Sequence, residues 1–184
     1  MSRALVDLAR AVDFAARKHK DQRRKGAAAE PYVNHPAEVA RLVAEATDGD
    51  DAVVVLGAIL HDTIEDTQTT RQELEDEFGI EVATLVVELT DDKSLPKAER
   101  KQLQEEHAPH KSPRAKMIKL ADKTSNLLSL ATSPPTDWDE RRMREYFDWA
   151  ARVVAGCRGV NQKLEDAFDQ AYRSGLAFLD AKRD

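Results

Sequence analysis

The stretch at residues 53–67, VVVLGAILHDTIEDT, sets an apolar run directly before four ionisable side chains. Residues 53–60 carry no polar side chain, and the ionisable residues that follow are His61, Asp62, Glu65 and Asp66. Burying charged groups beside such a run costs free energy unless they are paired or bind a metal. If the segment stays helical, the four side chains share one broad face, because residues four apart lie one above the other. We therefore predict a buried helix that ends in a polar site, with a water-facing helix end as the alternative.

Two further segments could complete such a site. NHP at residues 34–36 lies upstream of the central stretch, and LADK at residues 120–123 lies downstream. With His61 and Asp62, they give a set of two imidazoles and two carboxylates without a thiolate. Such a set suits a borderline-to-hard divalent ion such as Mn²⁺, Fe²⁺ or Zn²⁺. The sequence therefore indicates a metal site whose ligands are His35, His61, Asp62 and Asp122.

Asp122 is the most informative member of this set. It interrupts an apolar stripe, where an unpaired carboxylate would be destabilising by on the order of several kcal/mol. Metal binding would remove that cost. A salt bridge to Lys119 or Lys123 is the alternative, although we expect those neighbours to project at other angles. His35 taken alone could be structural or solvent-facing, and it is interpreted as a ligand because the other three residues accompany it.

These motifs are part of an ordered set that resembles the HD-domain phosphohydrolases. Within that superfamily the chain is similar to the small alarmone hydrolases, which are stand-alone relatives of the hydrolase half of the RelA/SpoT proteins. Their animal counterparts are the MESH-type enzymes. The matching segments are AARKH and QRRK within residues 15–25, PYVNHP at 31–36, LHDTIEDT at 60–67, FG at 78–79, LTDDKSLPKAERK at 89–101, APHKSP at 108–113, KLADK at 119–123, NL at 126–127 and EYFDWAARVV at 145–154. A lone His-Asp pair is weak evidence, whereas this ordered set covers nearly the whole chain.

The resemblance implies roles for residues around the metal. Glu65 and Asp66 would orient or deprotonate the attacking water, as an acid one helical turn from a metal can do. A surface acidic pair is the alternative. Arg24 and Lys25, in a loop free to fold over the site, would contact substrate phosphates. The resemblance places the remaining substrate contacts at Tyr32, Lys97, Asn126, Arg142 and Tyr146, for which a solvated surface is the alternative.

Composition limits the class of protein. A chain of 184 residues is long enough for one good core and too short for two, so we expect residues 1–184 to form a single HD-type domain. No apolar run reaches membrane-spanning length, and the first residues lack the features of a signal peptide. The single cysteine, Cys157, rules out an intrachain disulfide framework and is expected in the core. These features predict a cytoplasmic protein.

The charge pattern argues against a nucleic acid partner, and the lack of a membrane-spanning apolar run argues against a membrane partner. The formal net charge is −6, which disfavours broad electrostatic binding to nucleic acid. Basic residues nevertheless gather at residues 17–25 and 141–144. A local basic cluster in an acidic protein suits a small polyanion, although a solvated face is the commoner meaning of a charge run. We expect a small nucleotide polyphosphate as the partner and leave the oligomeric state open.

Hydrophobic periodicity and capping residues predict an all-α fold, a compact helical bundle of the HD-domain type. An amphipathic helix at residues 3–19 would use Leu5, Leu8, Val12, Ala15 and Ala16 as its apolar stripe. Asn34 would cap the helix that follows the loop at residues 22–31. The further helices are expected from about 36 to 46, 51 to 60, 70 to 78, 80 to 89, 96 to 106, 113 to 130, 138 to 157 and 160 to 180.

The resemblance implies a metal-dependent pyrophosphohydrolase that acts on ppGpp and pppGpp, releasing pyrophosphate and GDP or GTP. Mn²⁺ is the expected cofactor, with Zn²⁺ or Fe²⁺ as alternatives. The same site acting on (p)ppApp or on the 2′-phosphate of NADPH is the second interpretation. A non-catalytic, metal-stabilised binding protein is the third, and a turnover assay separates it from the other two.

One segment departs from the relatives. They usually carry a bulky apolar residue and then His or Tyr before the position of Asn126, whereas this chain has Thr124 and Ser125. Losing a ring there is expected to widen the nucleoside pocket or to remove a stacking or hydrogen-bonding partner. The plain loop at residues 26–30 could also change contacts near the sugar. The expected chemistry is therefore better defined than the expected base.

Overall fold

A computed structural model describes residues 3–181, and this part of the chain is almost entirely helical. It contains no strand, only an isolated bridge between Arg23 and Pro31, so the predicted all-α class is confirmed. The elements are α1 (Arg3–Lys18), α2 (Asn34–Ala46), α3 (Ala52–Leu60), α4 (Thr63–Asp66), α5 (Arg71–Phe78), α6 (Ile80–Leu89), α7 (Lys97–His107), the 3₁₀ turn η1 (Ala108–His110), α8 (Pro113–Thr132), α9 (Glu140–Ala155) and α10 (Gln162–Asp180). Residues 1–2 and 182–184 lie outside the described part. The organisation of residues 1–184 as one domain stays a prediction.

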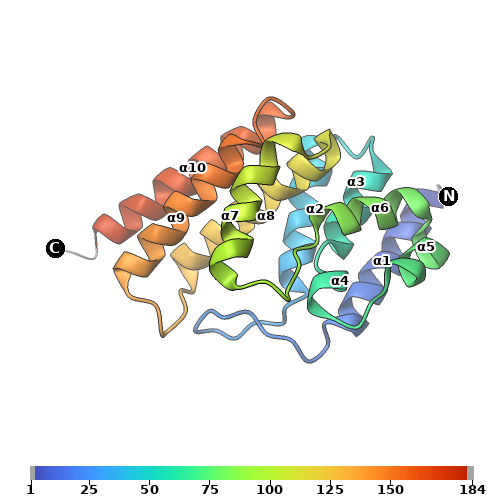
Figure 1. Cartoon of the computed structure of the whole chain (residues 1–184), viewed down its shortest axis with the longest axis horizontal. Coiled ribbons are helices and arrows are strands. Elements are labelled where there is room, and N and C mark those ends of the chain that lie inside the picture. The colour runs from blue at the N-terminus through green and yellow to red at the C-terminus, as the bar shows by residue number, and fades with distance from the viewer. Residues whose placement is uncertain (1–2, 182–184) are drawn as a thin grey trace.

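The helices form a bundle elongated along one axis (Figure 1). The long helices α9 and α10 lie side by side at one end, and α1, α5 and α6 lie at the other. α3 packs against α1, α2, α6 and α8, which explains why its apolar run is buried from Val54 to Leu60. No helix within residues 3–181 has both the length and the apolar character needed to cross a membrane.

Several helix ends form as their capping residues predict. Asp51 accepts a hydrogen bond from the Val54 amide at 3.2 Å and starts α3. Thr70 caps α5 in the same way, and Ser112 accepts from the third amide of α8. Gly79 ends α5 with a φ of 87°, a conformation that glycine adopts at no steric cost.

Two predictions at the N-terminal end of the chain are wrong. Of the apolar stripe predicted for α1, Ala15 is buried, but Leu5 is 60% exposed and Val12 is 42% exposed, because the buried face also takes in Ala11 and Phe14 and leaves those two residues outside it. Asn34 is the first residue of α2 and does not cap it. Its side chain donates to Glu30 Oε2 at 3.4 Å, and the capping position has no side-chain hydrogen bond.

The central helix does not continue through the ionisable residues. α3 ends at Leu60, and α4 begins at Thr63 after a two-residue break. The Thr63 hydroxyl donates to the Leu60 carbonyl at 2.7 Å, so the break is tied to the end of α3. His61 and Asp62 therefore sit at a bend between two helices, and the single broad helical face considered from the sequence is not formed.

Packing between the two C-terminal helices depends on Gly175. A Cβ atom at this position of α10 would lie 2.2 Å from Cε1 and 2.3 Å from Cζ of Phe147 in α9, whose ring is buried. We expect Gly175→Ala to lower the free energy of unfolding by about 1–3 kcal/mol through overpacking, although alanine is the better helix former. Urea unfolding measures the change, with the exposed Ser174→Ala as the control. Equal free energies of unfolding for the two variants would show that the Phe147 ring can move aside without destabilising the protein.

Candidate active site

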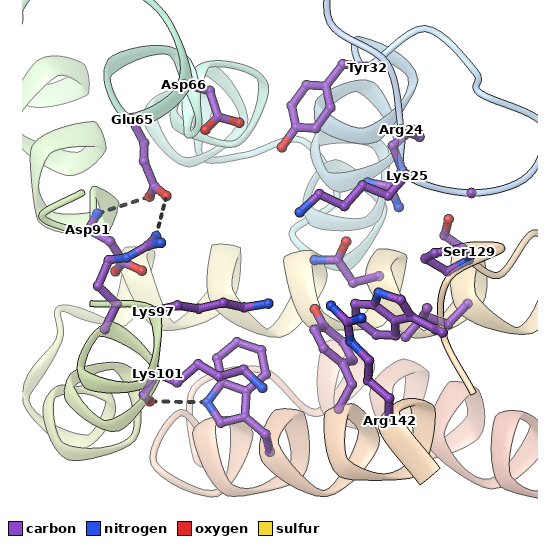
Figure 2. Close-up of a pocket in the computed structure, with 18 of the residues that line it drawn as sticks. Arg24, Lys25, Tyr32, Glu65, Asp66, Asp91, Lys97, Lys101, Ser129 and Arg142 are labelled. Atoms are coloured by element: carbon purple, nitrogen blue, oxygen red, sulfur yellow. Dashed lines mark hydrogen bonds and ion pairs between the residues drawn. The ribbon is translucent and has the colours of Figure 1, made fainter. Parts of the chain in front are cut away.

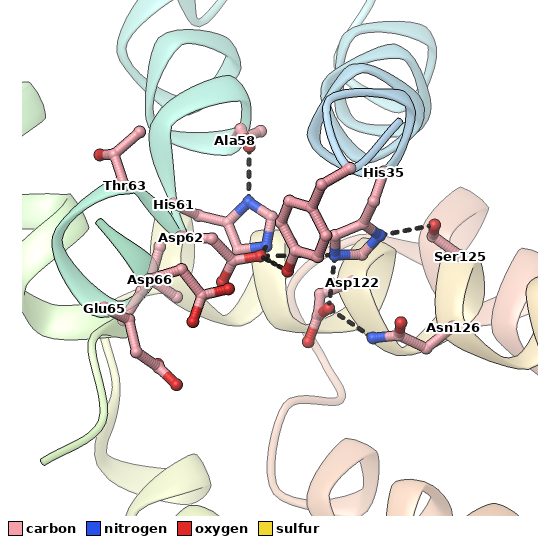
Figure 3. Close-up of polar contacts among 12 residues, drawn as sticks. His35, Ala58, His61, Asp62, Thr63, Glu65, Asp66, Asp122, Ser125 and Asn126 are labelled. Carbon is pink, nitrogen blue, oxygen red and sulfur yellow. Dashed lines mark hydrogen bonds and ion pairs between the residues drawn. The ribbon is translucent and has the colours of Figure 1, made fainter. Parts of the chain in front are cut away.

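His35, His61 and Asp62 bring three possible metal-ligand atoms within 4.8 Å of one another. His35 comes from the first turn of α2, and the other two residues occupy the bend between α3 and α4. Asp62 Oδ2 lies 3.7 Å from His35 Nε2 and 3.0 Å from His61 Nε2. Both imidazoles are buried, and they approach the same region from neighbouring helices (Figure 3).

Asp122 approaches this group from α8. Its Oδ1 atom is 3.2 Å from His35 Nε2 and accepts a hydrogen bond from Asn126 Nδ2 at 2.7 Å. Lys123 Nζ donates to its Oδ2 at 2.9 Å, so the expectation that Lys123 projects elsewhere is wrong. The lysine side chain is long and flexible enough to fold back beside its neighbour. Because the Asp122 charge is already paired, its burial alone does not require a metal. The feature that suits a metal is the convergence of imidazole nitrogens and carboxylate oxygens around it.

Each imidazole uses its Nδ1 atom on a partner outside the group. His61 Nδ1 lies 2.8 Å from the Ala58 carbonyl, which can only accept, so Nδ1 carries a proton. His35 Nδ1 lies 2.9 Å from Ser125 Oγ. His61 Nε2 is buried and has no aligned hydrogen-bond partner, although Asp62 is close. Unpaired buried nitrogens are uncommon, and imidazole nitrogens that converge with carboxylate oxygens can hold a divalent metal ion.

Charge and burial shift the pKa values of the group in different directions. Burial lowers the pKa of His35, which favours the neutral imidazole. Burial opposes the charge on Asp122, but the Lys123 ammonium, the contact with His35 and the nearby His61 together outweigh it and hold the pKa of Asp122 well below its usual range. For His61, burial is likewise outweighed by the Asp62 carboxylate, which raises the pKa of His61 to about 9. A metal would compete with that proton, because a ligating imidazole must be neutral.

Glu65 and Asp66 lie beside the group on the short helix α4 (Figure 3). Both oxygens of Asp66 are engaged: Gln22 Nε2 donates to Oδ2 at 2.8 Å, and Lys93 pairs with Oδ1. Glu65 Oε2 accepts from the Asp91 amide at 3.1 Å, whereas Oε1 has only a 3.8 Å ion pair with Arg100. Burial raises the pKa of Glu65. Glu65 is therefore the better placed of the two to accept a proton.

The group of candidate metal ligands opens onto a large cavity. A hollow of about 160 Å³ lies against His35, His61, Asp62 and Asp122. A larger cavity of about 750 Å³ adjoins it, since the two share five lining residues, Tyr32, Glu65, Asp66, Gln104 and Asn126. All seven residues that the sequence assigns to the substrate line the larger cavity, namely Arg24, Lys25, Tyr32, Lys97, Asn126, Arg142 and Tyr146.

The larger cavity combines cationic and aromatic side chains (Figure 2). The Arg142 guanidinium lies 4.6 Å from the Trp138 ring centroid. The ammonium groups of Lys101 and Lys123 lie 4.4 Å and 4.5 Å from the Trp149 ring centroid. Cationic groups suit phosphates, and flat aromatic faces suit a nucleobase.

Sequence reasoning missed Arg100, Lys101 and Trp149. The first two follow Lys97 at helical spacings of three and four, so all three basic residues of α7 share one face. That spacing could have identified them once Lys97 was chosen. Trp149 sits one turn after Tyr146 in α9, and the two rings make an edge-to-face contact with centroids 5.2 Å apart.

The loop that carries Arg24 and Lys25 is hydrogen-bonded to the segment that follows α8, and its freedom to move over the site stays a prediction. The Ala27 amide donates to the Pro134 carbonyl at 3.2 Å, and the Ala28 amide donates to Ser133 Oγ at 3.1 Å. The bridge between residues 23 and 31 closes the base of the loop. With these contacts formed, the two basic residues lie at the edge of the cavity.

Two of the predicted substrate contacts, Tyr32 and Asn126, also contact carboxylates of the candidate metal site. The Tyr32 hydroxyl donates to Asp62 Oδ2 at 2.6 Å. Burial and the Asp62 charge raise the pKa of Tyr32, which keeps the hydroxyl protonated. The Asn126 amide is engaged by Asp122, as described above. Both residues orient carboxylates and still line the cavity.

Thr124 and Ser125 do not face the larger cavity. Both are buried within α8. The Thr124 hydroxyl bonds back to the Leu120 carbonyl at 2.8 Å, and Ser125 lies behind His35. The expectation that these residues reshape the nucleoside pocket is therefore wrong, because Ser125 is turned toward α2 and the Thr124 hydroxyl bonds within its own helix.

Comparison with known proteins places the chain in a family. The HD domain model matches residues 11–160. The chain belongs to the HD-domain family. It is 52% identical over 172 residues to guanosine-3′,5′-bis(diphosphate) 3′-pyrophosphohydrolase MESH1 of Mus musculus, covering 94% of this chain and 96% of the relative. The MESH1 of Homo sapiens is 51% identical over 173 residues, covering 94% and 97%.

A solved structure supports the same placement within the HD-domain family. It is a metazoan ortholog of SpoT that hydrolyzes ppGpp and plays a role in starvation responses. It superposes with a TM-score of 0.87 at 44% sequence identity and covers 91% of this chain and 94% of that one. The resemblance to MESH-type hydrolases is therefore confirmed along nearly the full length of the chain.

Proposed function

We propose that this HD-domain chain is a metal-dependent (p)ppGpp 3′-pyrophosphohydrolase that converts ppGpp to GDP, and pppGpp to GTP, with release of pyrophosphate. One observation carries the proposal: the His35, His61, Asp62 and Asp122 side chains meet in a hollow that adjoins a cavity lined by cations and aromatic rings. The names of the MESH1 relatives support the same substrate. The cytoplasmic location expected from the sequence stays a prediction.

The four side chains are proposed as the metal ligands, with Mn²⁺ as the cofactor and Zn²⁺ or Fe²⁺ as alternatives. Their nitrogen and oxygen donors, without a thiolate, fit any of these ions. Such an ion supplies positive charge for phosphate oxygens and lowers the pKa of a coordinated water. Tyr32 and Asn126 would hold the two carboxylates in position through their hydrogen bonds.

The proposed reaction is attack by water on the 3′-diphosphate. Water forms a bond to the phosphorus nearest the ribose, and the bond from that phosphorus to the 3′ oxygen breaks. Pyrophosphate leaves with the oxygen of water, and the 3′ oxygen takes up a proton to become a hydroxyl. Glu65 would accept the proton of the attacking water, because its Oε1 atom is free of close hydrogen bonds and its pKa is raised by burial.

The basic side chains at the edge of the cavity would bind the substrate phosphates. We expect Arg24→Ala and Lys25→Ala to raise KM with little change in kcat if their contacts are equally strong in the ground and transition states. A fall in kcat would show contacts that strengthen in the transition state. Steady-state kinetics separate the two cases, and Arg17→Ala, on the exposed face of α1, is the matched control. Unchanged KM and kcat in both variants would remove these residues from the substrate site.

A substrate panel tests the proposed activity. Mn²⁺-loaded protein is incubated with ppGpp, ppApp and NADPH, and the products are identified by ³¹P NMR. We expect GDP and pyrophosphate from ppGpp. A preference for ppApp of tenfold or more in kcat/KM, about 1.4 kcal/mol, would overturn the assignment of guanine and leave the mechanism standing. Orthophosphate from NADPH as the main product would instead favour the phosphatase, and no turnover of any substrate would favour a binding protein.

A further inference from the structure

Behind His35, a chain of three polar side chains joins α2 to α8. His35 Nδ1 lies 2.9 Å from Ser125 Oγ, and Ser125 Oγ lies 2.6 Å from Glu38 Oε2. Ser125 is fully buried, and Glu38 follows His35 by one turn of α2, with its side chain 35% exposed. The chain therefore runs from the metal-ligand group to the protein surface through a buried hydroxyl.

The donors and acceptors in this chain can be assigned in order. The Glu38 carboxylate can only accept, so the single hydroxyl proton of Ser125 is directed to it. The Ser125 oxygen then accepts from His35, which requires the proton on Nδ1. In a neutral imidazole this leaves the lone pair on Nε2. Nε2 then presents its lone pair on the side of Asp122 Oδ1, at 3.2 Å, and Asp62 Oδ2, at 3.7 Å, where a bound cation would lie between the nitrogen and the carboxylate oxygens. A proton on Nε2, donated to Asp122, is the competing state.

The alternative is that Ser125 only fills space within its helix, with its hydroxyl bonded to the backbone of that helix. The neighbouring Thr124 is an example of this arrangement. The Thr124 hydroxyl bonds to the carbonyl four residues earlier in its own helix, at 2.8 Å. Serine within a helix commonly does the same. Ser125 instead reaches across to another helix and contacts both an imidazole and a carboxylate. The Ser125 hydroxyl thus accepts from His35 and donates to Glu38, and it makes no bond to its own helix backbone in this geometry.

The two imidazoles are oriented by different means. His61 donates its Nδ1 proton to a backbone carbonyl of its own helix, which no side-chain substitution removes. His35 depends on Ser125 and Glu38, which are both replaceable. Hydrogen bonds to the outer nitrogen of a metal-ligating histidine fix its tautomer and ring orientation, and their loss typically lowers metal affinity by about 10–100-fold.

We propose that Ser125 and Glu38 are positioning residues that hold His35 as its Nδ1–H tautomer, so that Nε2 is presented to a divalent ion. This inference rests on the metal site of the proposed function. It assigns Ser125 to metal affinity, whereas the sequence pattern had suggested a role in selecting the base. Glu38 is given a role for which its sequence position offers no signal.

The tautomer is measured first, in metal-free protein, so that the result does not depend on turnover. Long-range ¹H–¹⁵N NMR of ¹⁵N-histidine-labelled protein distinguishes the two tautomers, and a His35→Asn variant assigns the signals. We expect the Nδ1–H form of His35 in the native protein and loss of that preference in Ser125→Ala. The Nε2–H form in the native protein would overturn the proposal.

Metal affinity is the second measurement, read from free Mn²⁺ by electron paramagnetic resonance. Ser125→Ala is expected to weaken Mn²⁺ binding by about 10–100-fold, and Glu38→Ala by a smaller factor. Thr124→Val removes a buried hydroxyl at the adjacent position and is the matched control, expected to leave both the tautomer and the affinity unchanged. If Ser125→Ala does not fold, Glu38→Ala carries the test, because Glu38 is partly exposed. If Ser125→Ala and Glu38→Ala bind Mn²⁺ as tightly as Thr124→Val does, the positioning role of Ser125 and Glu38 is overturned.

The outcome is separable from that of the proposed function. Suppose that the native protein shows the Nδ1–H tautomer and that Ser125→Ala binds Mn²⁺ more weakly, but no ppGpp is hydrolysed. The positioning role would then stand and the proposed activity would be wrong. If ppGpp is hydrolysed but Ser125→Ala and Glu38→Ala bind Mn²⁺ with unchanged affinity, the proposed activity would stand and the positioning role would be wrong.

Discussion

An Asp122→Ala protein is expected to lose its bound divalent ion, its hydrolase activity and part of its thermal stability together. Asp122 Oδ1 lies 3.2 Å from His35 Nε2, and Lys123 donates to its other oxygen. Removing the carboxylate takes away a proposed ligand and the charge partner of a buried ammonium. Breaking a buried pair in this way costs about 3–5 kcal/mol. Metal content, turnover and thermal unfolding measure the three losses.

The double variant Asp122→Ala/Lys123→Met separates the ion pair from the metal. Replacing both partners removes the uncompensated ammonium, so we expect much of the lost stability to return in metal-free protein. Metal binding should remain lost, and with it the extra stability that a bound ion gives the folded state. Near-stoichiometric metal of normal affinity in Asp122→Ala would rule out Asp122 as a ligand.

The second large effect is expected at Glu65. Glu65→Gln keeps the shape of the side chain but removes the proton acceptor, so kcat should fall by roughly 10²–10⁴ while metal content persists. Because burial raises the pKa of Glu65, turnover of the native enzyme should fall as the pH drops through that raised value. The variant should lose this acidic limb. A pH profile of kcat measures both effects.

Asp66→Asn provides the comparison. Both oxygens of Asp66 are held by Gln22 and Lys93, so this change should disturb position more than proton transfer and cost less in kcat. Unchanged turnover of Glu65→Gln at saturating substrate would remove Glu65 as the base. A larger loss in Asp66→Asn than in Glu65→Gln would reassign that role to Asp66.

Features set by local sequence could be predicted. Asp51, Thr70 and Ser112 cap their helices because the interaction reaches only two or three residues along the chain. In α6, residues Val82, Leu85, Val86 and Leu89 recur at helical spacing and are buried, and Cys157 lies in the core. Asn34 shows the limit of such reasoning, since a competing contact with Glu30 takes its side chain away from the cap.

Features set by contacts between helices could not be predicted. The bend at His61 and Asp62 follows an apolar run that gives no sign of a break. Lys123 can fold back to pair with Asp122 because its ammonium lies over the Trp149 ring, which comes from another helix. The partners of the Ser125 hydroxyl likewise depend on how α2 packs against α8. The residues that the ordered motifs predict nevertheless lie near one another, because each motif lies on an element that the fold brings to one of two adjoining cavities.

The most direct test of metal-dependent pyrophosphohydrolysis is a titration of metal-stripped protein with Mn²⁺ in the presence of ppGpp. Pyrophosphate and GDP are quantified at each step. We predict no turnover with chelator present, a rise that levels off near one Mn²⁺ per chain, and equal amounts of the two products. Full turnover in chelator, or orthophosphate in place of pyrophosphate, would contradict the assignment.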